Sequence, residues 1–111
     1  MNETLSPDIE EMKEKVGEAS AFLKKVSNPD RLLVVCTLVH GERSVRELED
    51  LLGIRQPGLS QQLAELRAAG LVSARKEGKA VYYSLADPRV EQFVATMHRL
   101  FCEEYDAAEH K

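Results

Sequence analysis

The stretch that decides the fold runs from Ser44 to Leu85 and reads SVRELEDLLGIRQPGLSQQLAELRAAGLVSARKEGKAVYYSL. Its first half carries apolar residues at helical spacing, in two short segments on either side of Gly53-Ile54-Arg55-Gln56. Its second half instead alternates apolar and polar residues on either side of Glu77-Gly78-Lys79. The change from a helical to an alternating period predicts two short helices followed by a β-hairpin.

The boundaries of these elements carry their own signals. Ser44 can cap the first helix together with Glu47 three residues later, and Gly53 can end it. Pro57 suits the first position of the second helix, and Gly70 suits its end. We therefore expect a helix-turn-helix over residues 44–69 and a two-stranded wing over residues 71–86.

Three further helices are expected outside this stretch. Residues 1–27 carry an apolar stripe at spacings of three and four: Ile9, Met12, Val16, Ala19, Leu23 and Val26. Asn28-Pro29-Asp30 starts a helix that is apolar nearly all round, typical of a central position, and that contains Cys36. Asp87-Pro88 opens the last one, over residues 88–107, whose stripe is Val90, Phe93, Val94, Met97, Leu100 and Phe101, with Cys102 beside it.

The order of these elements predicts a mainly α fold with a small β-hairpin, a winged helix-turn-helix of about five helices and a two-stranded wing. A length of 111 residues fits one domain, residues 1–111. The longest apolar run, Leu32 to Cys36, is far too short to span a bilayer, and the acidic N-terminal stretch has no apolar signal region. We therefore expect no membrane contact and a cytoplasmic location.

Charge is distributed unevenly along the chain. The net charge is −4, yet residues 55–89 carry six basic and three acidic side chains. Acidic segments flank this positive block on both sides. A net acidic protein still binds nucleic acid when its basic groups share one face, because phosphate contacts are local. An ordinary solvated surface is the alternative interpretation of the same charges.

The positive block coincides with the expected helix-turn-helix and wing. Ser60, Gln61 and Gln62 lie early on the second helix, where neutral hydrogen-bonding side chains can read base edges. Basic residues of the turn and wing can reach flanking phosphates. The candidate residues for contact with double-stranded DNA are Arg55, Gln56, Pro57, Ser60, Gln61, Gln62, Arg75, Lys76 and Lys79.

The sequence at this point resembles the ArsR family of bacterial repressors. The resemblance rests on Asn28-Pro29-Asp30-Arg31-Leu32, on the segments Leu48–Ile54, Gln56–Leu63 and Leu66–Val72, and on the wing from Arg75 to Leu85. It implies a homodimer formed by the first and last helices, a recognition helix at about Pro57–Ala69 and a pseudo-palindromic operator. It also implies repression that an inducer relieves.

The inducer is less directly indicated. Metal-sensing members of the family commonly place Cys-x-Cys at the start of the third helix, where this chain has Glu42 to Glu47 without a thiol. The Asp and His ligands of a second metal site, on the last helix, are also incomplete, so we expect no metal ion and no cofactor. One cysteine in each of the second and last helices, Cys36 and Cys102, resembles the persulfide-sensing branch. That resemblance implies an intramolecular di- or polysulfide bridge that releases DNA.

Two alternatives remain open from the residues. The thiols could bind a metal or metalloid together with His98, His40 or Glu103, since Cys102 and His98 are spaced to share a helix face. They could also be two small buried hydrophobes, and the domain a protein–protein module. We expect no enzyme, because no Ser/His/Asp grouping, phosphate loop or paired carboxylates suggest an active site.

Overall fold

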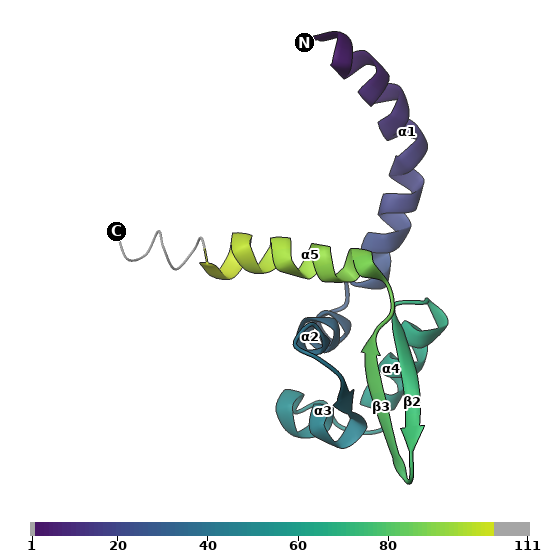
Figure 1. Ribbon diagram of the computed structural model, residues 1–111, viewed down its shortest axis with the longest axis vertical. Helices are drawn as coiled ribbons and strands as arrows, with labels where there is room; N and C mark the ends of the chain where they lie inside the picture. The colour runs from purple at the N-terminus through teal and green to yellow at the C-terminus, as the bar shows by residue number, and fades with distance from the viewer. Residues whose placement is uncertain (1, 104–111) are drawn as a thin grey trace.

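The computed structural model describes residues 2–103, and within them the side chains of residues 8–102. This part of the chain forms five α-helices, three strands and a final π-helical turn, and Figure 1 shows how the helices and the sheet are arranged. The elements are α1 (Asn2–Lys25), α2 (Pro29–Leu38), β1 (Arg43–Ser44), α3 (Val45–Leu52), α4 (Gly58–Ala68), β2 (Val72–Glu77), β3 (Ala80–Leu85), α5 (Pro88–His98) and η1 (Arg99–Glu103). The mainly α winged helix-turn-helix is confirmed.

The predicted boundary signals act where expected. The Ser44 hydroxyl accepts a hydrogen bond from the Glu47 N–H, while the Glu47 carboxylate accepts one from the Ser44 N–H, which completes a capping box for α3. Gly53 ends α3 with a φ of 70°, a left-handed conformation that glycine adopts without strain. Asp87 caps α5 by accepting from the Arg89 N–H.

The sheet has three strands, where the sequence predicted a two-stranded wing. The strand order is β1-β3-β2, all neighbours antiparallel, with Arg43 opposite Tyr83 and Ser44 opposite Tyr82. The prediction missed β1 because a strand of two residues is too short to show alternation. This extra strand joins the start of α3 to the wing, so the helix-turn-helix and the hairpin form one body.

The core joins α2, α3, α4 and the first turns of α5. Its fully buried members are Leu48, Leu59, Leu63, Leu66, Leu71, Val34, Val35 and Val90. Helix α2 contributes Val34, Val35 and Leu38 to the core, as its expected central position requires, but Leu33 is 48% exposed. Helix α2 therefore has one face in the core and another on the surface.

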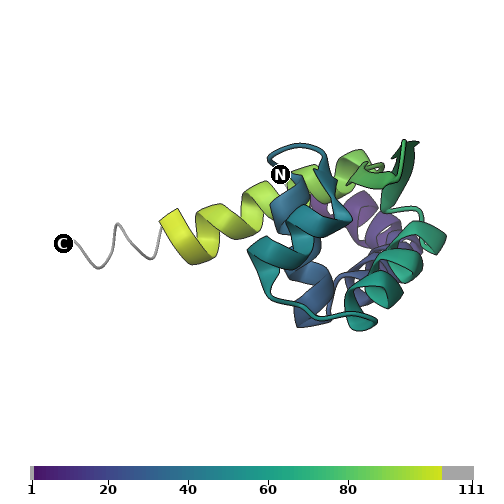
Figure 2. The same ribbon diagram turned by 90° about the horizontal axis from the view of Figure 1, so that it is seen from below.

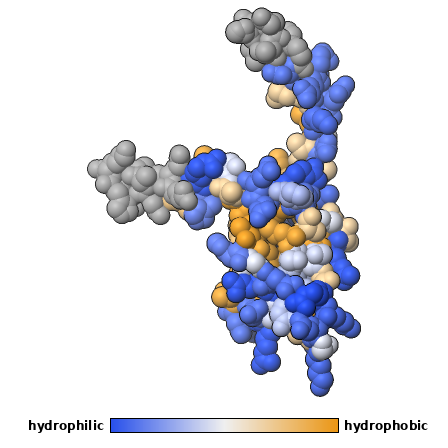
Figure 3. Space-filling model, in the orientation of Figure 1, coloured by the Kyte–Doolittle hydropathy of each residue, from blue (hydrophilic) through white to orange (hydrophobic). Residues whose placement is uncertain are grey.

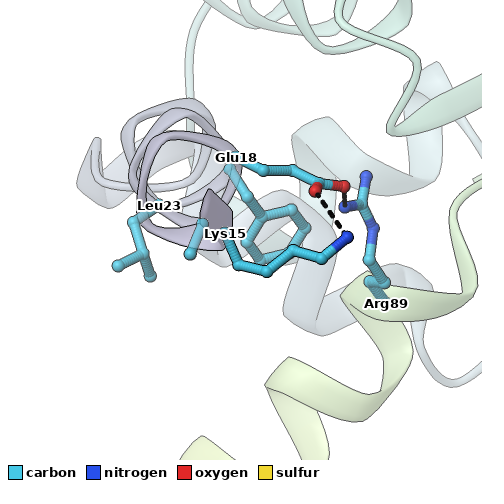
Figure 4. Close-up of a pocket in the computed structure, with 6 residues that line it drawn as sticks. Lys15, Glu18, Leu23 and Arg89 are labelled. Atoms are coloured by element: carbon cyan, nitrogen blue, oxygen red, sulfur yellow. Dashed lines mark hydrogen bonds and ion pairs between the residues drawn. The ribbon is translucent and has the colours of Figure 1, made fainter. Parts of the chain in front are cut away.

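Helices α1 and α5 extend away from this body in different directions (Figures 1 and 2). The Cα radius of gyration is 17.1 Å, against about 13 Å expected for a compact chain of this length. The C-terminal part of α1 is anchored: the ring of Phe22 packs edge-on against Phe93 at 5.6 Å, and Val26 is buried. Figure 4 shows Glu18 of α1 facing both Lys15 and Arg89, the latter from α5.

Most of α1 lies uncovered. Four large apolar side chains of its predicted stripe are at least half exposed: Ile9, Met12, Val16 and Leu23. Leu100 and Phe101, which follow α5, are exposed to a similar or greater degree. A stripe this long has no counterpart within the described chain to bury it.

None of the helices within residues 2–103 is both long enough and apolar enough to cross a membrane.

Candidate nucleic-acid interface and thiol pocket

The start of α4 is held by the turn before it. The Gln56 side-chain oxygen accepts a hydrogen bond from the Ser60 N–H at 3.0 Å, so this glutamine supplies the missing cap. Pro57 directly precedes the helix, which begins at Gly58, one residue after its predicted start. This bond pairs one of the N–H groups that the first turn of a helix otherwise leaves without a partner.

The three polar residues of α4 are in two different situations. Ser60 and Gln61 are exposed on the side of α4 away from its buried leucines. Gln62 is half-buried, and its side-chain oxygen accepts from the Nε of Arg31 at 2.9 Å. The structure therefore leaves Ser60 and Gln61 open to a large ligand and ties Gln62 to α2.

The basic residues of the wing also divide. The Arg75 guanidinium donates to both oxygens of Glu42 at 2.9 and 2.8 Å, and to Glu77 at 2.6 Å. These bonds hold the pKa of the Glu42 carboxyl below its usual value. Arg75 also lies 4.8 Å from the centre of the Tyr82 ring. Arg75 thus ties the wing to the segment before β1, while Lys76 and Lys79 are exposed, as is Arg55 in the turn.

The two cysteines share one pocket beside α5. Cys36 of α2 and Cys102 of η1 line a cavity of about 380 Å³ together with Val39, His40, Val94, Ala95, Met97, His98 and Phe101. The space-filling view shows apolar surface gathered beneath α5, over the body of the domain (Figure 3). Two thiols from distant parts of the sequence therefore face the same largely apolar space.

The two thiols differ in their surroundings. Cys36 is half-buried and packs against the core, whereas Cys102 is exposed, so the alternative of two buried hydrophobes is wrong for Cys102. Burial, and to a smaller extent the neighbouring Cys102, raise the pKa of the Cys36 thiol above its ordinary value. At neutral pH, Cys36 therefore keeps its proton, and the exposed Cys102 meets a reagent first.

This difference predicts the order of alkylation. We expect iodoacetamide to label Cys102 before Cys36 near neutral pH, and labelling of Cys36 to keep accelerating with pH beyond 9.0, the ordinary thiol pKa. In Cys102→Ser, Cys36 should label at lower pH, since one cause of its raised pKa is gone. Peptide mass spectrometry over a pH series measures both rates. Equal rates for the two thiols at every pH would contradict the assignment.

Two histidines that could bind a metal together with the thiols lie in the same pocket. His40 and His98 both line it beside the cysteines. Within residues 8–102, however, no group of three or more His, Cys, Asp or Glu side chains is arranged to hold a metal ion. Glu103, the third candidate, lies outside the described side chains. The π-helical turn at Arg99–Glu103 changes the helical spacing between His98 and Cys102 that the sequence suggested.

Comparisons with known proteins agree with this architecture. Residues 28–74 match the family described as bacterial regulatory protein, arsR family. The chain is 45% identical to the biofilm growth-associated repressor of Xylella fastidiosa over 93 residues, which is 84% of this chain and 82% of that protein. It is 40% identical to the transcriptional activator HlyU of Vibrio cholerae, over 86% of this chain and 89% of that protein.

Solved structures place the same elements together. The crystal structure of the repressor BigR from Xylella fastidiosa superposes with a TM-score of 0.81, covering 84% of this chain and 95% of that one at 45% identity. A homodimeric winged helix-turn-helix DNA-binding domain from Mycobacterium bovis superposes with a TM-score of 0.69, covering 90% and 91% at 29% identity. Family, relatives and fold agree: this chain belongs to the arsR family of bacterial regulatory proteins, which are DNA-binding regulators.

Proposed function

We propose that this protein is a dimeric, cytoplasmic transcriptional repressor that releases its operator when reactive sulfur species bridge Cys36 and Cys102. The observation that carries the proposal is the shared pocket, in which one thiol from α2 faces one from the end of the α5 arm. Membership of a family of regulators argues against an enzyme and against a purely protein-binding module.

The uncovered apolar stripe supports the dimer. Met12 is 60% exposed and Phe101 is 71% exposed, on arms that project from the body. Large apolar surfaces of this kind on small domains mark protein interfaces. A second copy of the chain offers a matching stripe under two-fold symmetry. The expected dimerisation segments, residues 1–27 and 88–107, contain both arms.

The DNA interface follows from the exposed surface of α4 and the wing. Ser60 and Gln61 present hydrogen-bonding groups for base edges, and Arg55, Lys76 and Lys79 present positive charge for flanking phosphates. Two copies related by two-fold symmetry place two recognition helices on one duplex, which calls for a pseudo-palindromic operator. Residues 44–69 and 71–86 act as its reading unit.

Gln61 gives this interface a direct test. Gln61→Ala is expected to reduce discrimination between operator and scrambled duplex by about 1–3 kcal/mol, the loss typical of one base-edge contact. Fluorescence anisotropy with both duplexes at fixed salt measures the change. Equal losses on the two duplexes would mean that Gln61 contacts phosphate.

The sulfur chemistry balances with a hydropersulfide as the only reagent. A cysteine thiolate attacks the terminal sulfur of R–S–SH, forming Cys–S–SH and releasing the thiolate RS⁻, which takes up a proton. Once both cysteines are persulfides, Cys–S–S⁻ of one attacks the cysteine-bonded sulfur of the other. This step releases HS⁻ and closes a bridge of three sulfurs. Another equivalent of donor can lengthen one persulfide by one sulfur before closure.

The mixed surroundings of the thiols fit this sequence of steps. Exposed Cys102 is placed to take the first sulfur, and Cys36, kept protonated by burial, is placed to react second within the pocket. A metal response has less support, since the described side chains offer no set of three ligands. Zinc and arsenite nevertheless belong in the test as competing reagents.

Intact-protein mass spectrometry of the reduced chain tests the proposal, with glutathione persulfide, hydrogen peroxide, zinc and arsenite in parallel arms. A gain of one or two sulfurs with loss of two hydrogens, only with persulfide and mapped to Cys36 and Cys102, is the expected result. Operator binding, measured on the same samples, should then fall. An unmodified dithiol with unchanged DNA affinity would end the persulfide proposal, and release by zinc or arsenite would replace it.

A further inference from the structure

The contact between α2 and the recognition helix carries an inference that rests on the proposed function. Arg31 of α2 donates from Nε to the Gln62 side-chain oxygen at 2.9 Å and forms an ion pair with Glu65 through its terminal nitrogen. Gln62 and Glu65 both belong to α4 and are three residues apart, so they lie on one face of it. One guanidinium therefore contacts α4 at two successive turns, and this contact of Arg31 with Gln62 and Glu65 is called the grip below.

The base of this grip is fixed. Arg31 stands in the first turn of α2, where the Asn28 side chain accepts hydrogen bonds from the Asp30 and Arg31 N–H groups at 2.8 and 3.2 Å. The Arg31 side chain is 26% exposed and so is partly withdrawn from water, whereas its partner Glu65 is 44% exposed. Two donors on a rigid planar fork fix direction as well as distance, which a lysine cannot do.

A second contact holds the other end of α4. The Lys25 ammonium, at the end of α1, donates to the Ala69 carbonyl at 3.4 Å, where the helix leaves unpaired acceptors. Between the two contacts, the buried leucines Leu59, Leu63 and Leu66 pack α4 into the core. Arg31 therefore adds a directed contact between α2 and α4 to the packing of the buried leucines.

Helix α2 also carries the half-buried thiol. Cys36 lies five residues after Arg31 on this helix of ten residues and faces the pocket shared with Cys102. A bridge between the two cysteines ties α2 to the end of the α5 arm. The contacts of Arg31 with Gln62 and Glu65 offer a route by which a shift of α2 could reach α4, beside the core packing that the two helices share.

We propose that Arg31 is the positioning residue that orients the recognition helix and transmits the state of the thiol pair to it. Gln62 then serves as part of this coupling and not as a reader of bases. Arg31 touches no DNA in this assignment. It acts through Gln62 and Glu65, and its loss changes selectivity and response instead of removing a phosphate contact.

The test compares Arg31→Gln with Lys24→Gln, which removes the same charge from an exposed position of α1, outside both α2 and α4. The probes are a duplex selected by the wild-type chain from a random library and a scrambled duplex. Each is titrated at several salt concentrations, with the protein reduced and after glutathione persulfide. Arg31→Lys tests whether charge alone suffices, and Glu65→Gln tests the grip from its other side.

We expect Arg31→Gln to lose about tenfold in discrimination between the two duplexes, with the salt dependence of binding unchanged, because no phosphate contact is removed. The ratio of reduced to bridged affinity should shrink toward one, from a wild-type value in the range of about 5–150 that such couplings span. Arg31→Lys should behave like Arg31→Gln, and Glu65→Gln should show a smaller change in the same direction. Lys24→Gln should match the wild type in both ratios.

Wild-type discrimination and response in Arg31→Gln would overturn the inference, as would a reduced salt dependence, which marks a phosphate contact. A wild-type chain that binds no selected duplex, or binds it equally in both thiol states, would instead count against the proposed function. If the wild type binds the selected duplex but does not respond to persulfide, only the discrimination between the two duplexes tests the positioning role. A loss of that discrimination in Arg31→Gln would support the role, and its retention would contradict it. If circular dichroism shows that Arg31→Gln folds poorly, Glu65→Gln replaces it in the comparison with the wild type. The Glu65 side chain is partly exposed, so this change removes the ion pair with Arg31 without disturbing the core.

Discussion

A chain in which Met12 and Val16 are both replaced by glutamate is expected to sediment as a monomer and to lose about 10²–10⁴-fold in operator affinity. Both side chains lie on the uncovered stripe of α1, at 60% and 58% exposure. The substitutions therefore disturb little within one chain but place two charges in the proposed interface, where their desolvation is costly. A monomer reads one half-site and forfeits the gain from binding two at once.

The matched control adds the same negative charge to the opposite face of α1. Ala21→Glu with Lys24→Gln changes two exposed residues away from the stripe and should leave the dimer intact. Sedimentation velocity and anisotropy on the selected duplex measure both pairs. Loss of the dimer in the control, or its survival in Met12→Glu/Val16→Glu, would place the interface elsewhere.

Cys102→Ser is expected to bind operator like the reduced wild type and to stay bound after persulfide. The side chain is exposed at the edge of the thiol pocket, so serine replaces it without opening the core. In the wild type, persulfide should weaken binding by about 5–150-fold, the usual range for coupling between two sites. In the variant no bridge can close, and the change should vanish.

Cys36→Ser should show the same insensitivity, although it replaces a residue packed against the core and carries some cost in stability. A reductant added after persulfide should restore wild-type binding, which separates a reversible bridge from irreversible oxidation. Release that persists in Cys102→Ser would show that the switch does not depend on the pair.

Features encoded by neighbours in the sequence could be predicted, and features made by distant residues could not. The α3 capping box depends on Ser44 and Glu47, three residues apart, and the end of α3 depends on Gly53 alone. Strand β1 needs Tyr82 and Tyr83 to pair with, nearly forty residues later, and so left no local pattern.

The same division runs through the candidate site. Ser60 and Gln61 could be placed on the surface of α4 from the spacing of its leucines. Arg75 looked like a free cation in the sequence, because its partner Glu42 is 33 residues away. The grip of Arg31 on Gln62 was equally invisible, although the pairing of Cys36 with Cys102 could be suggested from a resemblance. Charge in a sequence identifies candidate DNA contacts, but only tertiary structure shows which are already engaged.

The shape of α1 has a thermodynamic consequence. Its C-terminal end is anchored by Phe22 and by Val26, the residue that follows the helix, but residues 8–21 are all exposed in the single chain. An unsupported helix of that length is only marginally stable in water. Association would then supply part of the free energy that keeps α1 helical, so folding and assembly obey one mass-action equilibrium. The melting temperature would rise with protein concentration, and the cell's supply of the chain would govern how much of it is fully ordered.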